Sequence, residues 1–261
     1  MTSFEDCRRE LLERGGPPAQ EAYRRWLGRP GYQSVHEFVH GFVHQYLTEI
    51  TREEMLDARA RSEHALGDVR SEEQLPEVED WTTRFAFEHL FHRYLEEQRA
   101  VPTWQEFSGW LNGDGAAFFI HPLLQDLGWY QADRERRRAL KRAFRWRLGK
   151  FYYSTMRELE LFVRLRQEYG LPVRYHLLAD VLLRADLWLD DDVVCVYFAN
   201  PKYRDRDRGR KPQAEQLLGK ATPPFRIHHV AIERQGYGNF WIPSDASVER
   251  LARVLGAQAS G

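Results

Sequence analysis

The acidic side chains best placed to do chemistry lie in residues 158–186. Glu158 and Glu160 belong to RELELFVRLRQEYG, which the sequence predicts as a helix, and Asp186 belongs to RADLWL, a predicted strand. One aspartate and one helix glutamate would give two protein ligands, which Mg²⁺ accepts because it keeps several of its waters. The alternative for Asp186 is an ordinary acid at a strand edge.

Histidines offer two further possibilities. His176 and Asp180 would form an acid–base couple if their side chains met; otherwise they are partly exposed polar groups. His36, His40 and His44 recur at every fourth residue, a spacing that brings imidazoles together on a helix and can bind zinc. No cysteine accompanies them, and they border an apolar stripe, so we expect them to be boundary residues of an amphipathic helix.

Charge is distributed unevenly, although the net charge is only −1. Acid dominates residues 49–80, while arginine and lysine dominate 134–150 (RERRRALKRAFRWRLGK) and 204–211 (RDRDRGRK). Cations neutralise phosphates and release counterions, and aromatic side chains stack on exposed bases. The two basic segments together predict nucleic-acid binding, with DNA expected in preference to RNA; singly, each fits a solvated helix face or loop. The expected contacts are Arg137, Lys141, Arg145, Arg204, Arg208, Arg210, Lys211 and Gln213.

The composition limits the classes of protein to which the chain can belong. The chain has 261 residues, of which 43% are hydrophobic, enough for a buried core. No apolar run approaches the roughly 20 residues of a membrane-spanning helix, and the charged first residues lack a signal-peptide core. Cys7 and Cys195 lack the neighbours of a metal knuckle or a redox pair. We therefore expect a cytoplasmic protein with two reduced thiols and no membrane partner.

The elements that must position these residues change character near Pro172. Residues 1–156 are predicted to be almost wholly helical, with capping boxes at Ser34–Glu37 and Thr103–Glu106 and an apolar stripe from Val35 to Tyr46. The strands expected after Pro172 are VRYHLL, LLRADLWL, VVCVYFA, FRIHHVAI and NFWIP. A tight turn is expected at the three aspartates 190–192, and a final helix at 245–257. The expected fold class is α+β, with a helical domain at 1–150 and a compact α/β domain with a mixed sheet at 151–261.

Residues 155–257 resemble the PD-(D/E)XK nuclease superfamily, which includes restriction endonucleases. The resemblance rests on the helix that carries Glu158 and Glu160, the strand that carries Asp186, and the helix KPQAEQLLGK after the next strand. It implies a nuclease-like core in which carboxylates, here Asp186 and Glu158, bind Mg²⁺. The metal activates a water for attack on phosphorus, and a lysine stabilises the developing charge.

The second strand departs from the family's pattern. A carboxylate-X-lysine triplet is expected near Tyr197–Ala199, where the chain has neither an acid nor a lysine. Lys202 and Lys211 are the lysines that would replace the missing one. The first hypothesis is therefore a nucleic-acid-binding protein with weakened or lost catalysis, suited to a mobile-element or phage-defence system.

Two alternatives stay open at this point. One is an active Mg²⁺-dependent nuclease that uses Glu158 or Glu160, Asp186 and Lys202. The other is a structural subunit whose helical domain, rich in aromatic residues, docks on a partner protein.

Overall fold

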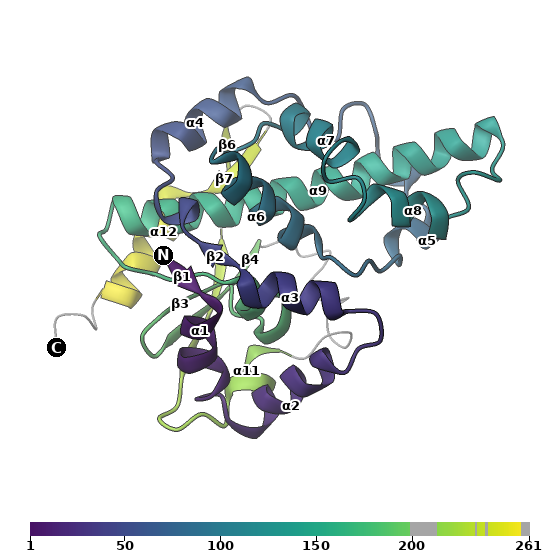
Figure 1. Cartoon of the computed structure of the whole chain (residues 1–261). Coiled ribbons are helices and arrows are strands. Elements are labelled where there is room, and N and C mark those ends of the chain that lie inside the picture. Colours follow the sequence, from purple (N-terminus) through teal and green to yellow (C-terminus); the bar gives the residue numbers. More distant parts are fainter. Residues whose placement is uncertain (199–212, 233, 238–239, 257–261) are drawn as a thin grey trace. The chain divides into compact units, whose positions relative to one another are not determined.

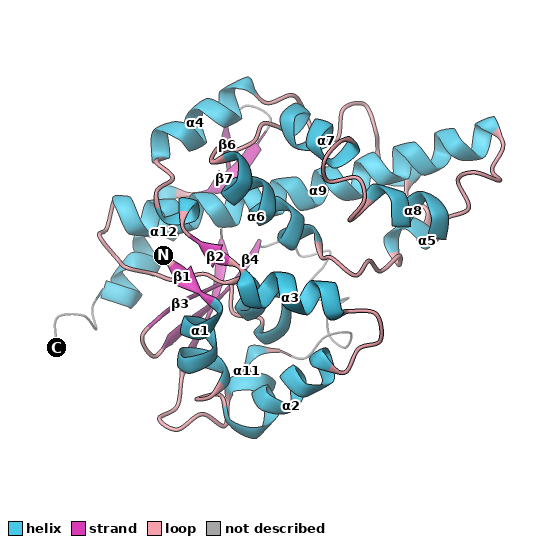
Figure 2. Cartoon of the chain, viewed as in Figure 1, coloured by secondary structure: helices cyan, strands magenta, loops and turns pink. Residues whose placement is uncertain are grey.

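The chain folds into two compact units (Figure 1). The computed structural model describes residues 1–198, 213–232, 234–237 and 240–256. The sheet unit comprises residues 1–52, 158–236 and 241–261, and the helical unit comprises 53–157 and 237–240. Helices predominate and the strands are few, so the predicted α+β class is confirmed (Figure 2). The predicted boundary near residue 150 instead falls inside a long helix, and the first 52 residues fold with the sheet.

The N-terminal elements of the sheet unit are short. They are β1 (Thr2–Ser3), α1 (Phe4–Cys7), α2 (Gly16–Leu27), α3 (Gln33–Gly41) and β2 (Val43–His44), with a π-helical turn at Arg8–Leu12 and a 3₁₀ turn at Tyr46–Thr48. β1 pairs with β2 in an antiparallel ribbon, Thr2 opposite His44. This pairing stops α3 at Gly41, so the predicted helical stripe does not continue to Tyr46. The predicted capping box at Ser34 is also absent, because the helix starts at Gln33, whose side-chain amide donates to Glu37 at 2.9 Å.

The elements after residue 158 build the mixed sheet. They are the end of α9 (Arg134–Gln167), a π-helical turn at Ala179–Leu183, β3 (Leu187–Leu189), β4 (Asp192–Phe198), α11 (Ala214–Leu218), β5 (Arg226–Ile232) and α12 (Asp245–Gly256). β3 and β4 pair antiparallel through the expected turn, with Leu189 opposite Asp192, and β5 pairs parallel to β4. β6 (Arg234–Tyr237) and β7 (Phe240–Pro243) form a separate ribbon. The strand expected at VRYHLL is reduced to one bridge, in which Arg174 and Trp188 exchange hydrogen bonds of 2.8 and 3.1 Å.

Glu10 ties the N-terminal segment to the sheet. Its carboxylate accepts a hydrogen bond from the indole of Trp188 at 2.9 Å and one from the guanidinium of Arg174 at 2.6 Å. Trp188 is fully buried in the centre of β3. A buried indole N–H needs a partner, and the residue that supplies it lies 178 positions earlier in the chain. This long-range contact explains why residues 1–52 fold with the sheet rather than with the helices that follow them.

The helical unit has an aromatic core. Its helices are α4 (Arg52–Arg61), α5 (Pro76–Glu79), α6 (Phe87–Gln98), α7 (Trp104–Asn112), α8 (Ile120–Asp126) and the first part of α9, with a 3₁₀ turn at Ser71–Glu73. Phe107 on α7 is fully buried, and its ring centroid lies 5.3 Å from those of both Phe87 and Phe91 on α6. The predicted capping box at the start of α7 is confirmed. Thr103 Oγ1 accepts from the Glu106 N–H, and Glu106 accepts from the Thr103 N–H at 2.8 Å.

We expect Phe107→Ala to destabilise the helical unit by about 3–5 kcal/mol, because it leaves a cavity among packed rings. Tyr130, 61% exposed, provides the control: Tyr130→Ala should change stability by less than about 0.5 kcal/mol. Urea unfolding followed by circular dichroism measures both. Equal unfolding midpoints for the two variants would show that Phe107 does not anchor this core.

Candidate functional site

Asp186 lies just before β3 and is bound by the backbone of β4. Its N–H donates to the carbonyl of Val194 at 3.0 Å, and its carboxylate accepts a short hydrogen bond from the N–H of Val196. Cys195 lies between Val194 and Val196 on β4, and the charge of Asp186 acts on its thiol. Asp186 is therefore held against the backbone of β4, near Cys195.

Cys195, the neighbour of Asp186 on β4, is a poor ligand for Mg²⁺. Burial raises the pKa of its thiol to about 12, and the negative charges of Asp186 and Glu215 add to the effect. The thiol is therefore protonated at neutral pH, and Mg²⁺ prefers oxygen ligands. Throughout the residues that the structure describes, no group of three His, Cys, Asp or Glu side chains is arranged to hold a metal ion. The predicted Mg²⁺ site needs only two protein carboxylates, Asp186 and Glu158, and it stays a prediction.

The other predicted residues of the nuclease-like core, catalytic and nucleic-acid-binding, lie as follows. Glu158 is half-buried and Glu160 is fully buried on α9, in the same compact unit as Asp186. Gln213 is exposed and caps α11, where its N–H donates to Gln216 at 3.2 Å. Five predicted residues lie outside the described residues, as does Ala199 of the triplet position: Lys202, Arg204, Arg208, Arg210 and Lys211.

The one acid on β4, Asp192, has a structural role. Arg226 donates two hydrogen bonds to it, at 2.8 and 2.7 Å, and His228 Nε2 lies 2.6 Å from the same carboxylate. Asp192 is 2% exposed. Burial alone would raise the pKa of Asp192, but the hydrogen bonds from Arg226 and His228 outweigh it and lower the pKa. Because both partners lie on β5, this carboxylate joins the two parallel strands and is not available as a metal ligand.

The histidines do not form the predicted alternatives. His176 is fully buried, and its Nδ1 accepts from the Leu178 N–H at 3.1 Å, while Asp180 accepts from the Tyr175 hydroxyl at 2.9 Å. Burial lowers the pKa of His176 to about 4, so it is neutral at physiological pH. His36 and His40 bond the Trp26 carbonyl and the Tyr23 hydroxyl. These contacts agree with the expected structural role of the α3 histidines.

Most arginines of the basic segment on α9 bind within the helical unit. Arg137 donates to the carbonyls of Trp129 and Tyr130, both at 3.0 Å. Arg145 donates to the carbonyls of Ala65 and His64, at 3.1 and 3.3 Å. Two of the predicted nucleic-acid contacts, Arg137 and Arg145, therefore use their guanidinium groups to hold loops.

Other α9 arginines pair with the acidic segment 49–80. Arg142 binds Glu73 through two nitrogens and Asp68 at 3.0 Å, and Arg136 binds Glu77. The two oppositely charged segments seen in the sequence thus partly neutralise each other. The sequence could not reveal this, because the partners are 59 to 74 residues apart.

The exposed cations of α9 include Arg134, Arg138 and Lys141. None of these three forms an ion pair with another side chain in the part of the chain that the structure describes. They lie at positions i, i+4 and i+7 and so share one side of the helix, which we call the basic face. With Trp129, Arg137 and Glu135 they line a surface groove. Lys141 was expected from the sequence, whereas Arg134 and Arg138 were missed, although their helical spacing is visible in it.

Comparison with known proteins gives no relative: no family model, curated protein or solved structure matches the chain. Across the described ranges, no helix has both the length and the apolar character needed to cross a membrane. Function must therefore be inferred from the side chains and their contacts.

We expect the Arg142–Glu73 contact to make the stability of the helical unit depend on pH. The hydrogen bond from Arg142 lowers the pKa of Glu73 to about 2, whereas an unfolded chain has a glutamate pKa of about 4.3. The stabilisation is therefore complete above the unfolded value and is lost as the pH falls towards the folded one. In Glu73→Gln, the urea midpoint should decline less than in the wild type between about pH 5 and pH 3.

Glu72→Gln is the matched control, since Glu72 is an exposed neighbour that accepts a hydrogen bond from Ser71. It should keep the wild-type pH profile. An unchanged profile in Glu73→Gln would contradict the assignment.

Proposed function

We propose that this protein binds nucleic acid, DNA in preference to RNA, through the basic face of α9, and that its nuclease-like core has weakened or lost catalysis. The observation that supports the proposal is the contrast between the cations of α9 that are bound within the helical unit and those of the basic face. Arg136, Arg137, Arg142 and Arg145 are engaged within the helical unit. The basic face keeps its positive charge exposed, which is the requirement for binding phosphates.

The setting of the basic face suits a nucleic-acid strand. Side chains three and four residues apart on a helix have Cβ atoms about 5–6 Å apart, so the three cations form a continuous positive row. Trp129 lines the same groove and is half-buried, which leaves part of the indole as a surface for an unpaired base. Glu135 in the groove is one negative charge against several positive ones.

The order of elements in the sheet unit supports the nuclease-like part of the proposal. The end of α9, the Arg174 bridge, β3, β4, α11 and β5 follow one another as the resemblance to PD-(D/E)XK nucleases implies. Asp186 lies beside β4, but its neighbour there is the thiol of Cys195, and the acid of β4 is bound by Arg226 and His228. This combination favours a binding platform over an active nuclease, and fits a cytoplasmic role in a mobile-element or phage-defence system.

Three of the five tryptophans of the helical unit give little support to the alternative of a structural subunit. Trp81, Trp104 and Trp110 of the helical unit are each at most 8% exposed. They form its core and are not presented to a partner protein.

Removing the basic face should weaken binding strongly. We expect the triple variant Arg134→Gln, Arg138→Gln, Lys141→Gln to bind a single-stranded DNA oligonucleotide on the order of 100-fold more weakly at low salt, because three phosphate contacts are lost. Gel shift measures the change. The control carries the same change of charge at Arg24, Arg25 and Arg253, each of which is paired with a nearby glutamate. If the basic-face variant binds like the wild type or no more weakly than the control variant, or if the wild type does not bind at all, the proposal fails.

Catalysis is tested separately with and without Mg²⁺. We expect the wild type and Asp186→Ala to bind DNA equally well, with EDTA making no difference and no cleavage of plasmid or single strands. Circular dichroism confirms that the variant is folded. Mg²⁺-dependent cleavage that disappears in Asp186→Ala would instead establish the active nuclease.

A further inference from the structure

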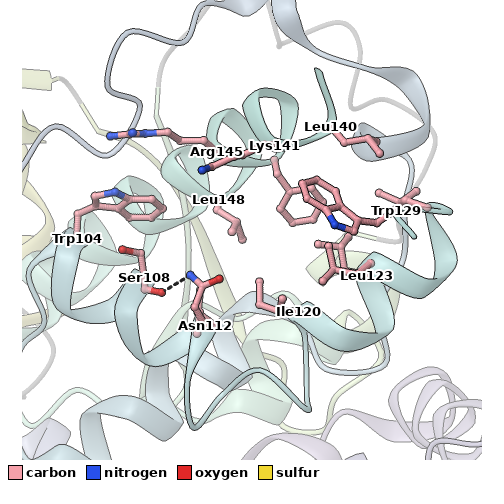
Figure 3. Close-up of a pocket in the computed structure, with 14 residues that line it drawn as sticks. Trp104, Ser108, Asn112, Ile120, Leu123, Trp129, Leu140, Lys141, Arg145 and Leu148 are labelled. Atoms are coloured by element: carbon pink, nitrogen blue, oxygen red, sulfur yellow. Dashed lines mark hydrogen bonds between the residues drawn. The ribbon is translucent and has the colours of Figure 1, made fainter. Parts of the chain in front are cut away.

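The helical unit contains a cavity of about 430 Å³ between α7, α8 and α9 (Figure 3). This volume falls in the range of roughly 300–1,000 Å³ that is typical of small-molecule sites. The walls are mostly apolar, with six leucines together with Trp104 on α7, Trp129 after α8 and Phe144 on α9. Because the pocket opens to solvent, a ligand with an apolar body would remove this apolar surface from water.

The pocket lining has few polar groups. One of them, Lys141, is a cation that forms no ion pair in the described residues. The Asn112 amide already donates to the Ser108 carbonyl at 2.6 Å. Arg145 directs its guanidinium to the carbonyls of residues 64 and 65. Lys141 is exposed and reaches the cavity from α9, across from Trp104 and Asn112 (Figure 3). The lining therefore offers one mobile ammonium group beside a large apolar surface.

We propose that this cavity binds a small amphipathic anion, with an alkyl or acyl body among the leucines and a single carboxylate on Lys141. Burying the alkyl body contributes about 0.8 kcal/mol for each CH₂ group removed from water, and a carboxylate forms a charge-assisted hydrogen bond with an ammonium group. A neutral apolar ligand would form no ion pair with Lys141. An apolar cation would be repelled by Lys141 and by the nearby charge of Arg145.

This site goes beyond nucleic-acid binding and does not require it. Lys141 belongs to both the basic face and the cavity, but the cavity itself is built by α7, α8 and the apolar side of α9. Ligand binding is therefore measured without nucleic acid, so that either proposal can fail while the other stands.

The test is calorimetric titration of the full chain with dodecanoate below its micelle concentration, with tryptophan fluorescence as a second readout. We expect dodecanoate to bind, and dodecanol to bind about tenfold more weakly because it lacks the charge. Lys141→Met should reduce the affinity for dodecanoate by about tenfold and leave that for dodecanol unchanged. Arg84→Met, which removes another exposed cation of the helical unit, should change neither.

Filling the cavity tests its location. Leu124→Trp on α8 should abolish binding of both ligands, while Gln125→Trp, at the adjacent exposed position, should not. Ile120→Phe replaces Leu124→Trp if circular dichroism shows that the latter does not fold. The proposal is overturned if the wild type does not bind dodecanoate, if a folded filled variant binds it normally, or if dodecanol binds equally tightly.

Discussion

The pairing of α9 arginines with the segment 64–81 is the interaction on which the helical unit depends. That segment has little regular structure, and guanidinium groups hold it from several directions. Arg145 binds carbonyls at its start, Arg142 binds Asp68 and Glu73 in its middle, and Arg147 donates to the Trp81 carbonyl at 2.7 Å at its end. The planar fork of arginine suits such multiple contacts better than lysine does. Because these arginines are engaged in the pairing, the cations of the basic face are the ones proposed to bind a ligand.

In the sheet unit, a different set of polar contacts fixes both the architecture and the chemistry. Asp192 joins β4 to β5 through Arg226 and His228, and Glu10 joins the N-terminal segment to Trp188. These carboxylates are bound by partners that hold strands and helices together. Asp186 is left beside a protonated thiol at Cys195, which is why the core is proposed to have weakened or lost catalysis.

Local patterns in the sequence predicted local structure well. The Thr103–Glu106 capping box, the turn at 190–192, the strand around His228 and the final helix all appear in the structure, because each depends on neighbouring residues. Predictions failed where distant residues decide. The N-terminal segment joins the sheet through Glu10, and α3 ends where β1 pairs with β2. The hydrogen bonds of Arg137 and Arg145 to loop carbonyls are also not visible in the local pattern, and their binding to nucleic acid stays a prediction. Burial, as at Cys195, likewise cannot be seen in composition or spacing.

The most direct test of the central claim is the salt dependence of affinity for a single-stranded DNA oligonucleotide. Three phosphate contacts on the basic face predict that the logarithm of the binding constant falls with the logarithm of salt concentration with a slope of about −2. The variant without Arg134, Arg138 and Lys141 should lose most of that slope. A wild-type affinity that does not change with salt, or the same slope in both proteins, would contradict the account.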